Sequence, residues 1–268
     1  MARLTRYMAK AQTAALPLPV SQKAKHHILD TLAAMVSGSQ LKPGRLAIAH
    51  AGQQGGPPEA QVVASRLRVS AVNAALSNGM LAHSDETDDT STRAGIHPGC
   101  AVVPAALAMA EREDASGAAF LRAVVLGYDV ACRTIMALGG KWALRARGHL
   151  AFSIGGTMGA AAAAGSLARL RAEQFPYLLS FGAQQASGVA TFARDHEHIE
   201  KAFIFGGMPA RNGLTAATMV QSGFTGVADV FTGEGNFLEV AGNRIMAGGA
   251  LDALGICRRD CGVNLTSF

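Results

Sequence analysis

A short acidic stretch lies between two histidines at residues 83–99, where the sequence reads HSDETDDTSTRAGIHPG. Within five positions it holds four carboxylates, from Asp85, Glu86, Asp88 and Asp89. Carboxylates at this density can bind a divalent cation, or they can move protons as general acids and bases. They can also be solvated charges that favour the start of a helix and do no chemistry. Charge alone does not choose among these three interpretations.

The metal interpretation has a specific form in this sequence. The run DETDD (85–89) fits the D-[DE]-x-x-D pattern with which all-helical prenyl synthases hold Mg²⁺ against a diphosphate. Such an enzyme needs a second acidic cluster, and RDHEHIEK (194–201) is not Asp-rich in that way. An EF-hand is excluded, because Thr90 stands where that loop needs Gly and Ile96 where it needs Glu. Metal-dependent prenyl transfer is therefore the weaker alternative, and we predict no metal site.

The acid–base interpretation needs no metal. A carboxylate, the hydroxyl of Thr90 and the imidazole of His97 would face a substrate, while a distant Lys or Arg holds the substrate's carboxylates. His97 directly precedes Pro98, which restricts its backbone and suits a group that must keep a constant position. A structural hydrogen bond from His97 explains the same residue, so spacing leaves both roles open.

Two predicted helices flank the acidic stretch and would position it. The first covers 69–83 with Ser70 as its N-cap, and the second covers 101–113 with Pro104 in its first turn. A connection between buried helices is where a rigid scaffold presents functional groups. Ser21 is the predicted N-cap of another helix. The remaining predicted helices cover 20–39, 115–139, 150–168, 173–193 and 211–223.

The composition indicates an all-α or mainly α domain with closely packed helices. Hydrophobic residues make up 49% of the 268 residues, charged residues 16% and aromatic residues 6%, so small aliphatic side chains must fill the core. Only 60–65 (AQVVAS) resembles a strand or a hairpin arm. The uncharged segment 150–168 is about as long as a membrane span, but its residues are too small and weakly hydrophobic. We predict a buried central helix there and no membrane association.

Charge and cysteine content limit the class of partner and the cellular compartment that we expect. The formal net charge is +5, but the Lys and Arg residues are scattered without interleaved aromatic residues, which argues against nucleic acid and for an anionic small molecule. Cys257 and Cys261 lack two further ligands for a zinc site. Widely spaced cysteines and the lack of a secretory signal in this sequence predict a reduced, cytoplasmic protein.

Several segments together resemble one known family. NGMLAHSDETDDT…HPG is similar to the NG-x-x-x-H-x-x-D-x-DD-[TS]…HP signature of the MmgE/PrpD family, whose members include 2-methylcitrate dehydratase, cis-aconitate decarboxylase and iminodisuccinate epimerase. The segments 28–38, 147–170 and 197–237 resemble the family's first long helix, its Ala-rich helix and its later lysine-bearing segment. The resemblance runs in order from about residue 20 to 240.

The resemblance implies a large helical domain, a smaller α+β lid domain and, usually, a homodimer. It also implies chemistry without a metal or organic cofactor. The family's reactions move a proton next to a carboxylate in a di- or tricarboxylic acid, with loss of water or CO₂ or with inversion. By resemblance, we expect a lyase or isomerase whose substrate is a small polycarboxylate.

Site residues follow from the resemblance position by position. Glu86 falls on the family's first catalytic acid, where Asp is usual, so Asp85 is an alternative base. The other matched positions are Asp88, Asp89, Thr90, His97 and Lys201. One extra residue between Thr90 and His97 departs from the family pattern, as does another after Lys201.

Three cations near the substrate are assigned with alternatives left open. Lys201 would anchor a substrate carboxylate, or it would pair with Glu197 on a helix surface. His149 matches a family position, but it would equally orient the turn at 148–157. Arg211, next to Asn212, would bind a carboxylate or cap a helix.

The end of the sequence changes character. We expect a helical domain over 1–245 and an irregular tail over 246–268, without the family's lid domain. A truncation or a changed reading frame would explain such a tail. The alternative function is therefore a catalytically inactive remnant that serves as an interaction or structural module.

Overall fold

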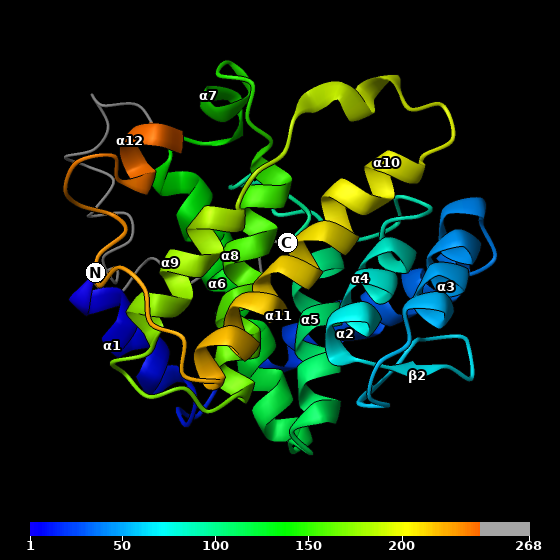
Figure 1. Cartoon of the computed structure of the whole chain (residues 1–268), viewed down its shortest axis with the longest axis horizontal. Helices are drawn as coiled ribbons and strands as arrows, with labels where there is room; N and C mark the ends of the chain where they lie inside the picture. Colours follow the sequence, from blue (N-terminus) through cyan, green and yellow to red (C-terminus); the bar gives the residue numbers. More distant parts are fainter. Residues whose placement is uncertain (242–268) are drawn as a thin grey trace.

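A computed structural model describes residues 1–241, and these residues form a mainly helical domain (Figure 1). The predicted all-α class is confirmed, since the described residues contain one short antiparallel hairpin and no separate α+β domain. The predicted tail at 246–268, with Cys257 and Cys261, lies outside the described residues.

The chain order of the elements is as follows. The helices and strands are α1 (Ala2–Ala11), α2 (Leu18–Gly38), α3 (Lys42–Gln54), β1 (Ala60–Gln61), β2 (Arg68–Val69), α4 (Ala71–Ala82), α5 (Gly99–Arg112), α6 (Gly117–Ala137), α7 (Lys141–Arg145), α8 (Ala151–Leu167), α9 (Phe175–Gln185), the 3₁₀ helix η1 (Ala190–Arg194), α10 (Ile199–Ala202), the π-helical turn η2 (Phe203–Gly207), α11 (Met208–Gln221) and α12 (Phe237–Ala241).

The Ala-rich helix α8 lies at the centre of the domain, as predicted. It packs against α5, α6, α9 and α11 (Figure 1). Phe152 is its one residue that is not buried. Helices surround α8 on all sides because its small side chains offer no polar face. Among residues 1–241, no helix is long and apolar enough to cross a membrane.

Glycine permits the close crossing of α6 and α8. A methyl group added at Gly159 would lie 2.6 Å from the carbonyl oxygen of Gly127, and one added at Gly127 would lie 2.9 Å from the carbonyl oxygen of Gly159. The two backbones therefore touch at this pair. Gly159 is the second glycine of the Gly155-x-x-x-Gly159 pair, a spacing that lets helix backbones approach closely.

We expect Gly159→Ala to lower the free energy of unfolding by about 1–3 kcal/mol, because the added methyl overpacks the α6–α8 crossing. Urea denaturation followed by circular dichroism measures the change. Gly117→Ala is the matched control, since a methyl group there meets no atom within 4 Å. Equal stabilities of the two variants would contradict the close crossing.

A second close approach joins the segment 198–207 to the end of α4. Methyl groups added at Gly79 and at Gly206 would each overlap the other residue's carbonyl oxygen, so no side chain fits between the two backbones. This contact lays α10 and η2 beside the residues that follow α4. The acidic stretch and the lysine-bearing segment consequently lie side by side.

Several sequence-based boundaries differ from the structure. Ser70 caps α4 as predicted, since its hydroxyl accepts from the N–H of Asn73. Ser21 does not cap α2, which begins earlier, at Leu18, because prolines at its N-terminus favour the first turn. Pro104 lies inside α5, which begins at Gly99. The helix predicted at 173–193 ends at Gln185, and 60–65 contributes only a two-residue strand.

Candidate active site

The acidic stretch is the connection between α4 and α5, and backbone contacts hold it in one shape. Ser91 and Ile96 form an isolated antiparallel bridge, with the Ser91 N–H donating to the Ile96 carbonyl at 2.8 Å. This bridge turns the chain back so that His97 returns to the residues that open the stretch. The connection is therefore a structured loop that can present side chains in constant directions.

Asp89 points into the protein and organises the base of this loop. One carboxylate oxygen accepts from the N–H of Gly99 at 3.0 Å, and the other accepts from the hydroxyl of Tyr128 at 2.7 Å and from Nδ1 of His27 at 2.8 Å. Its side chain is 6% exposed. Burial, and then the Asp89 charge, raises the pKa of Tyr128 well above its usual value. Asp89 is thus placed to hold the loop and the start of α5.

His97 is held by one ring nitrogen. Nδ1 lies 2.8 Å from the backbone carbonyl of Asp89 and 3.0 Å from the hydroxyl of Thr90. A carbonyl can only accept, so Nδ1 carries a proton and Nε2 of the neutral ring carries a lone pair. The ring stacks on Phe152, with centroids 5.1 Å apart. This arrangement suits a histidine whose Nε2 exchanges protons with a ligand.

His83 and Asp88 form a buried pair beneath the loop. Nδ1 of His83 lies 2.9 and 3.0 Å from the two oxygens of Asp88, and both side chains are 1% exposed. The His83 ring stacks on Phe205 with centroids 4.5 Å apart, and it lies 5.5 Å from the His97 ring. Asp88 therefore orients His83 and does not face a solvent-accessible space.

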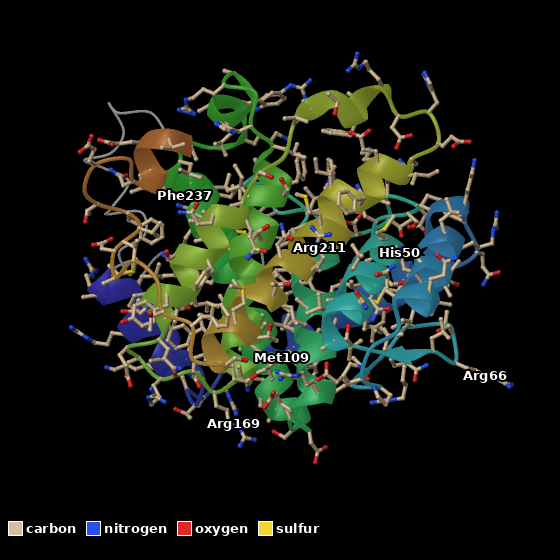
Figure 2. All side chains as sticks on the ribbon, viewed as in Figure 1. His50, Arg66, Met109, Arg169, Arg211 and Phe237 are labelled. Carbon is tan, nitrogen blue, oxygen red and sulfur yellow. The ribbon has the colours of Figure 1, made fainter. Side chains whose placement is uncertain are left out.

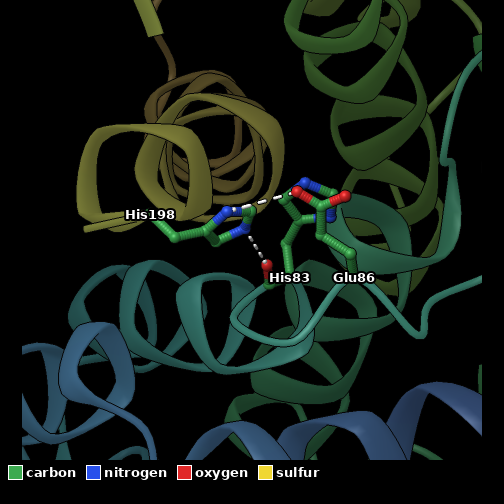
Figure 3. A group of neighbouring side chains, drawn as sticks. All are labelled: His83, Glu86 and His198. Atoms are coloured by element: carbon green, nitrogen blue, oxygen red, sulfur yellow. Dashed lines mark hydrogen bonds and ion pairs between the residues drawn. The ribbon is translucent and has the colours of Figure 1, made fainter. Parts of the chain in front are cut away.

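Glu86 lies beside the rings of His83 and His198 (Figure 3). Its backbone has a φ of 56°, a left-handed conformation that is rare for residues other than glycine. Its carboxylate accepts a hydrogen bond from Nζ of Lys201 and lies 3.2 Å from Nδ1 of His198. Partial burial acts to raise the pKa of Glu86, but the Lys201 hydrogen bond and charge outweigh it and, with His198 and His83, keep this pKa below its usual value.

We expect Lys201→Met to raise the pKa of Glu86, because the variant removes the hydrogen bond and charge that lower it while partial burial still acts to raise it. NMR titration of glutamate carboxyl carbons measures the change. Lys42→Met is the matched control, because Lys42 pairs with Glu197 on the surface. An unchanged Glu86 titration in Lys201→Met would show that this pair does not set the pKa.

The remaining predicted site residues, Asp85, His149 and Arg211, make other contacts. Asp85 accepts from the hydroxyl of Thr87 at 2.8 Å, which closes a local turn. His149 lines a hollow of about 120 Å³ whose wall includes Phe152, the ring that stacks on His97. Arg211 lies on α11 (Figure 2). It lines a different hollow of about 230 Å³ and donates to its neighbour Asn212.

Sequence reasoning did not assign roles to His83, His198 or Phe205. His83 opens the acidic stretch, and its spacing to Asp88 is a usable sign of a local pair. His198 is 115 residues further along the chain, yet its Nε2 lies 3.0 Å from the His83 carbonyl. No local pattern predicts that contact.

Two overlapping groups of side chains bring potential metal ligands within 4.8 Å of one another in the described part of the chain. One group is His83, Glu86 and His198, and the other is His83, Asp88 and Cys100. Both contain His83, so one imidazole is shared between the two possible sites.

Comparisons with known proteins show the family of the chain. The model of the MmgE/PrpD N-terminal domain matches residues 2–245. The chain is 28% identical over 239 residues to the cis-aconitate decarboxylase-like protein oryM of Aspergillus oryzae, covering 86% of this chain and 48% of that protein. It is 26% identical over 248 residues to a cis-aconitate decarboxylase of Aspergillus terreus, covering 89% of this chain and 49% of that protein.

The chain thus spans about half the length of the curated relatives it matches. The family model nevertheless covers most of the chain, including the acidic loop and the lysine-bearing segment. The chain therefore belongs to the MmgE/PrpD family, a family of dehydratase and decarboxylase type, and it contains the N-terminal domain of that family.

Proposed function

We propose that this chain supplies the helical part of a lyase or isomerase that moves a proton next to a carboxylate of a small di- or tricarboxylate. The observation that carries the proposal is the convergence of Glu86, His97 and Lys201 around the buried His83. The named activity of the curated relatives, cis-aconitate decarboxylation, supports the same substrate class.

Each group has a distinct part in this proposal. Glu86 is the base in this proposal. Lys201 keeps its pKa below the usual value and so weakens it as a proton acceptor, and that effect is lost when Lys201 moves away. His97 exchanges a proton through Nε2, while Thr90 and the Asp89 carbonyl hold Nδ1. Lys201 shifts between Glu86 and a substrate carboxylate, so that substrate binding releases Glu86 to act.

The required steps balance without a cofactor. In dehydration, a base removes a proton next to a carboxylate, and an acid protonates the departing hydroxyl group. In decarboxylation, CO₂ leaves and the remaining carbanion takes a proton from an acid. Inversion uses removal of a proton from one face and its return to the other. All three need a group that donates a proton, and dehydration and inversion also need a group that accepts one.

We propose the following roles for the remaining predicted residues. Asp88 and Asp89 position His83 and the loop. Asp85, which closes a local turn, is the alternative base. His149 lines the hollow next to Phe152, where it can meet a second substrate carboxylate. Arg211 lies in a separate hollow, and we assign it no direct contact with the substrate.

A second candidate function is an interaction or structural module without catalysis. Three large apolar side chains of α2 are strongly exposed, with Leu18 at 70%, Leu29 at 68% and Val36 at 54%. Because exposed apolar residues favour association, a second copy of the chain is the partner we propose, as a homodimer. Light scattering after size exclusion tests this assembly.

Proton NMR in D₂O tests the catalytic proposal directly. The purified chain is incubated with cis-aconitate, citrate, 2-methylcitrate or iminodisuccinate, alone and mixed with a full-length relative. Deuterium uptake, water loss or CO₂ loss by the chain alone supports catalysis. Unchanged spectra from folded chain, both alone and in the mixture beyond the relative's own turnover, would favour the module.

A further inference from the structure

Three side chains from two segments that are distant in the sequence bring potential metal-ligand atoms together beside the α4–α5 connection. A ring nitrogen of His83, a carboxylate oxygen of Glu86 and a ring nitrogen of His198 all lie within 4.8 Å of one another. Figure 3 shows the His198 ring and the Glu86 carboxylate beside the His83 ring. Two imidazoles and one carboxylate form a donor set that zinc and similar ions use.

In each histidine, the ring nitrogen that would not bind the metal already faces a hydrogen-bond acceptor. Nδ1 of His83 faces both oxygens of Asp88, and Nε2 of His198 donates to the His83 carbonyl at 3.0 Å. Histidines that bind metals almost always donate their other N–H to a carboxylate or a backbone carbonyl in this way. The arrangement leaves a lone pair on Nε2 of His83 and on Nδ1 of neutral His198.

Those two lone pairs lack suitable partners within the described residues. Nε2 of His83 is fully buried and makes no hydrogen bond. Nδ1 of His198 lies 3.2 Å from an oxygen of Glu86, and both atoms are acceptors in a neutral ring that keeps its proton on Nε2. Such a contact is favourable only when a proton or another cation lies between the atoms. The same cation would also give Nε2 of His83 a partner.

We propose that His83, Glu86 and His198 bind one divalent transition-metal ion, with zinc as the preferred ion. Ligand atoms around tetrahedral zinc lie about 3.3 Å apart, since bonds of roughly 2.0–2.1 Å meet at tetrahedral angles. The observed 3.2 Å between His198 and Glu86 matches this spacing. Ca²⁺ and Mg²⁺ prefer oxygen ligands and do not suit two imidazoles.

The alternative group with Cys100 suits zinc less well. The thiol of Cys100 donates to the His97 carbonyl at 3.2 Å. Zinc binds the thiolate, so an ion at Cys100 would remove the proton that the thiol donates in this hydrogen bond. In that group Asp88 would also stop orienting His83. The ion is therefore assigned to the side of His83 that faces Glu86.

Zinc and Lys201 compete for the same carboxylate. Nζ of Lys201 donates to the Glu86 oxygen that faces His198, so the ammonium group must move when the ion binds. If Glu86 is the base, as the proposed function holds, zinc inhibits turnover by occupying it. Only this consequence for activity rests on the proposed function, because zinc binding can be measured without substrate.

Calorimetric titration of the EDTA-treated chain with ZnCl₂ tests the site, and Co²⁺ absorption reports its geometry. We expect one zinc ion per chain at this site, with affinity at least about 100-fold lower in His198→Ala and in Glu86→Gln, since each loses one of three ligands. Lys201→Met should bind zinc roughly 30-fold more tightly, the effect of removing one positive charge about 4 Å from a divalent ion in water. Circular dichroism confirms that each variant is folded.

His196→Ala is the matched control, because His196 is exposed two residues before His198 and lies outside the cluster. Unchanged affinity in this variant supports the assignment. A wild-type chain that takes up no zinc overturns the proposal. So does equal affinity in wild type, His198→Ala and Glu86→Gln, which would place the ion elsewhere, for example on Cys257 and Cys261. Neither result depends on whether the chain turns over a polycarboxylate.

Discussion

His97→Asn is expected to lower kcat by about 10²- to 10⁴-fold, the range for loss of a general acid–base group. The substrate is the polycarboxylate that the NMR experiment identifies. Asparagine can keep the hydrogen bond to the Asp89 carbonyl that Nδ1 of His97 makes at 2.8 Å, but it cannot exchange a proton. The fold should therefore persist while the proton-transfer step slows. Steady-state kinetics with a parallel thermal melt separate the two effects.

Thr90→Val provides the matched comparison for His97. The Thr90 hydroxyl lies 3.0 Å from Nδ1 of His97, so its loss loosens the ring without removing it. We expect a decrease in kcat of only about 10-fold, typical of a group that orients another. If His97→Asn kept kcat within a few-fold of wild type, His97 would be a structural residue, and the group that exchanges a proton alongside Glu86 would be a different residue.

Asp89→Ala is expected to destabilise the protein by about 3–5 kcal/mol, the cost of breaking a buried pair by removing one partner. The carboxylate serves the Gly99 N–H, the Tyr128 hydroxyl and the His27 imidazole together. Alanine leaves these three groups without that acceptor. Urea denaturation at pH 7 gives the change in the free energy of unfolding.

Asp85→Ala is the control within the same loop. Asp85 closes a turn near the surface by accepting from Thr87, and the loss of such a contact changes stability by about 0.5 kcal/mol or less. A large difference between the two aspartate variants would show that direction, not charge, sets their importance. Similar small effects would contradict the buried role of Asp89.

The helix predictions were most accurate where residues close together in the sequence decide the end of a helix or its burial. Ser70 caps α4 because its hydroxyl needs only the N–H of Asn73, three residues away. The helix predicted at 150–168 is α8, since a run of small uncharged residues has no stable place except the core. Both predictions depended on contacts within a few residues.

Boundaries were predicted poorly where distant contacts set them. The start of α5 at Gly99 is earlier than predicted, because the Asp89 carboxylate accepts the Gly99 N–H from across the loop. Ser21 resembles an N-cap in sequence, but its hydroxyl donates to the Leu18 carbonyl within a helix that has already begun. Local chemistry at these positions is compatible with more than one structure.

The sequence by itself determined the mainly helical class, the buried Ala-rich helix and the place of the acidic stretch between two helices. These follow from hydrophobic pattern, caps and composition, which act over short distances. The family resemblance also placed Glu86 and Lys201 among the site residues before any contact was known.

Only the tertiary structure decided which acids of the loop point into the protein and which point towards solvent. A loop has no period that sets side-chain directions. Asp88 points inward because it pairs with His83, and Asp89 points inward because it pairs with His27 and Tyr128. Likewise, His198 reaches the loop from 115 residues away because Gly79 and Gly206 let two backbones touch. The chemistry of Glu86 depends on both of these long-range contacts.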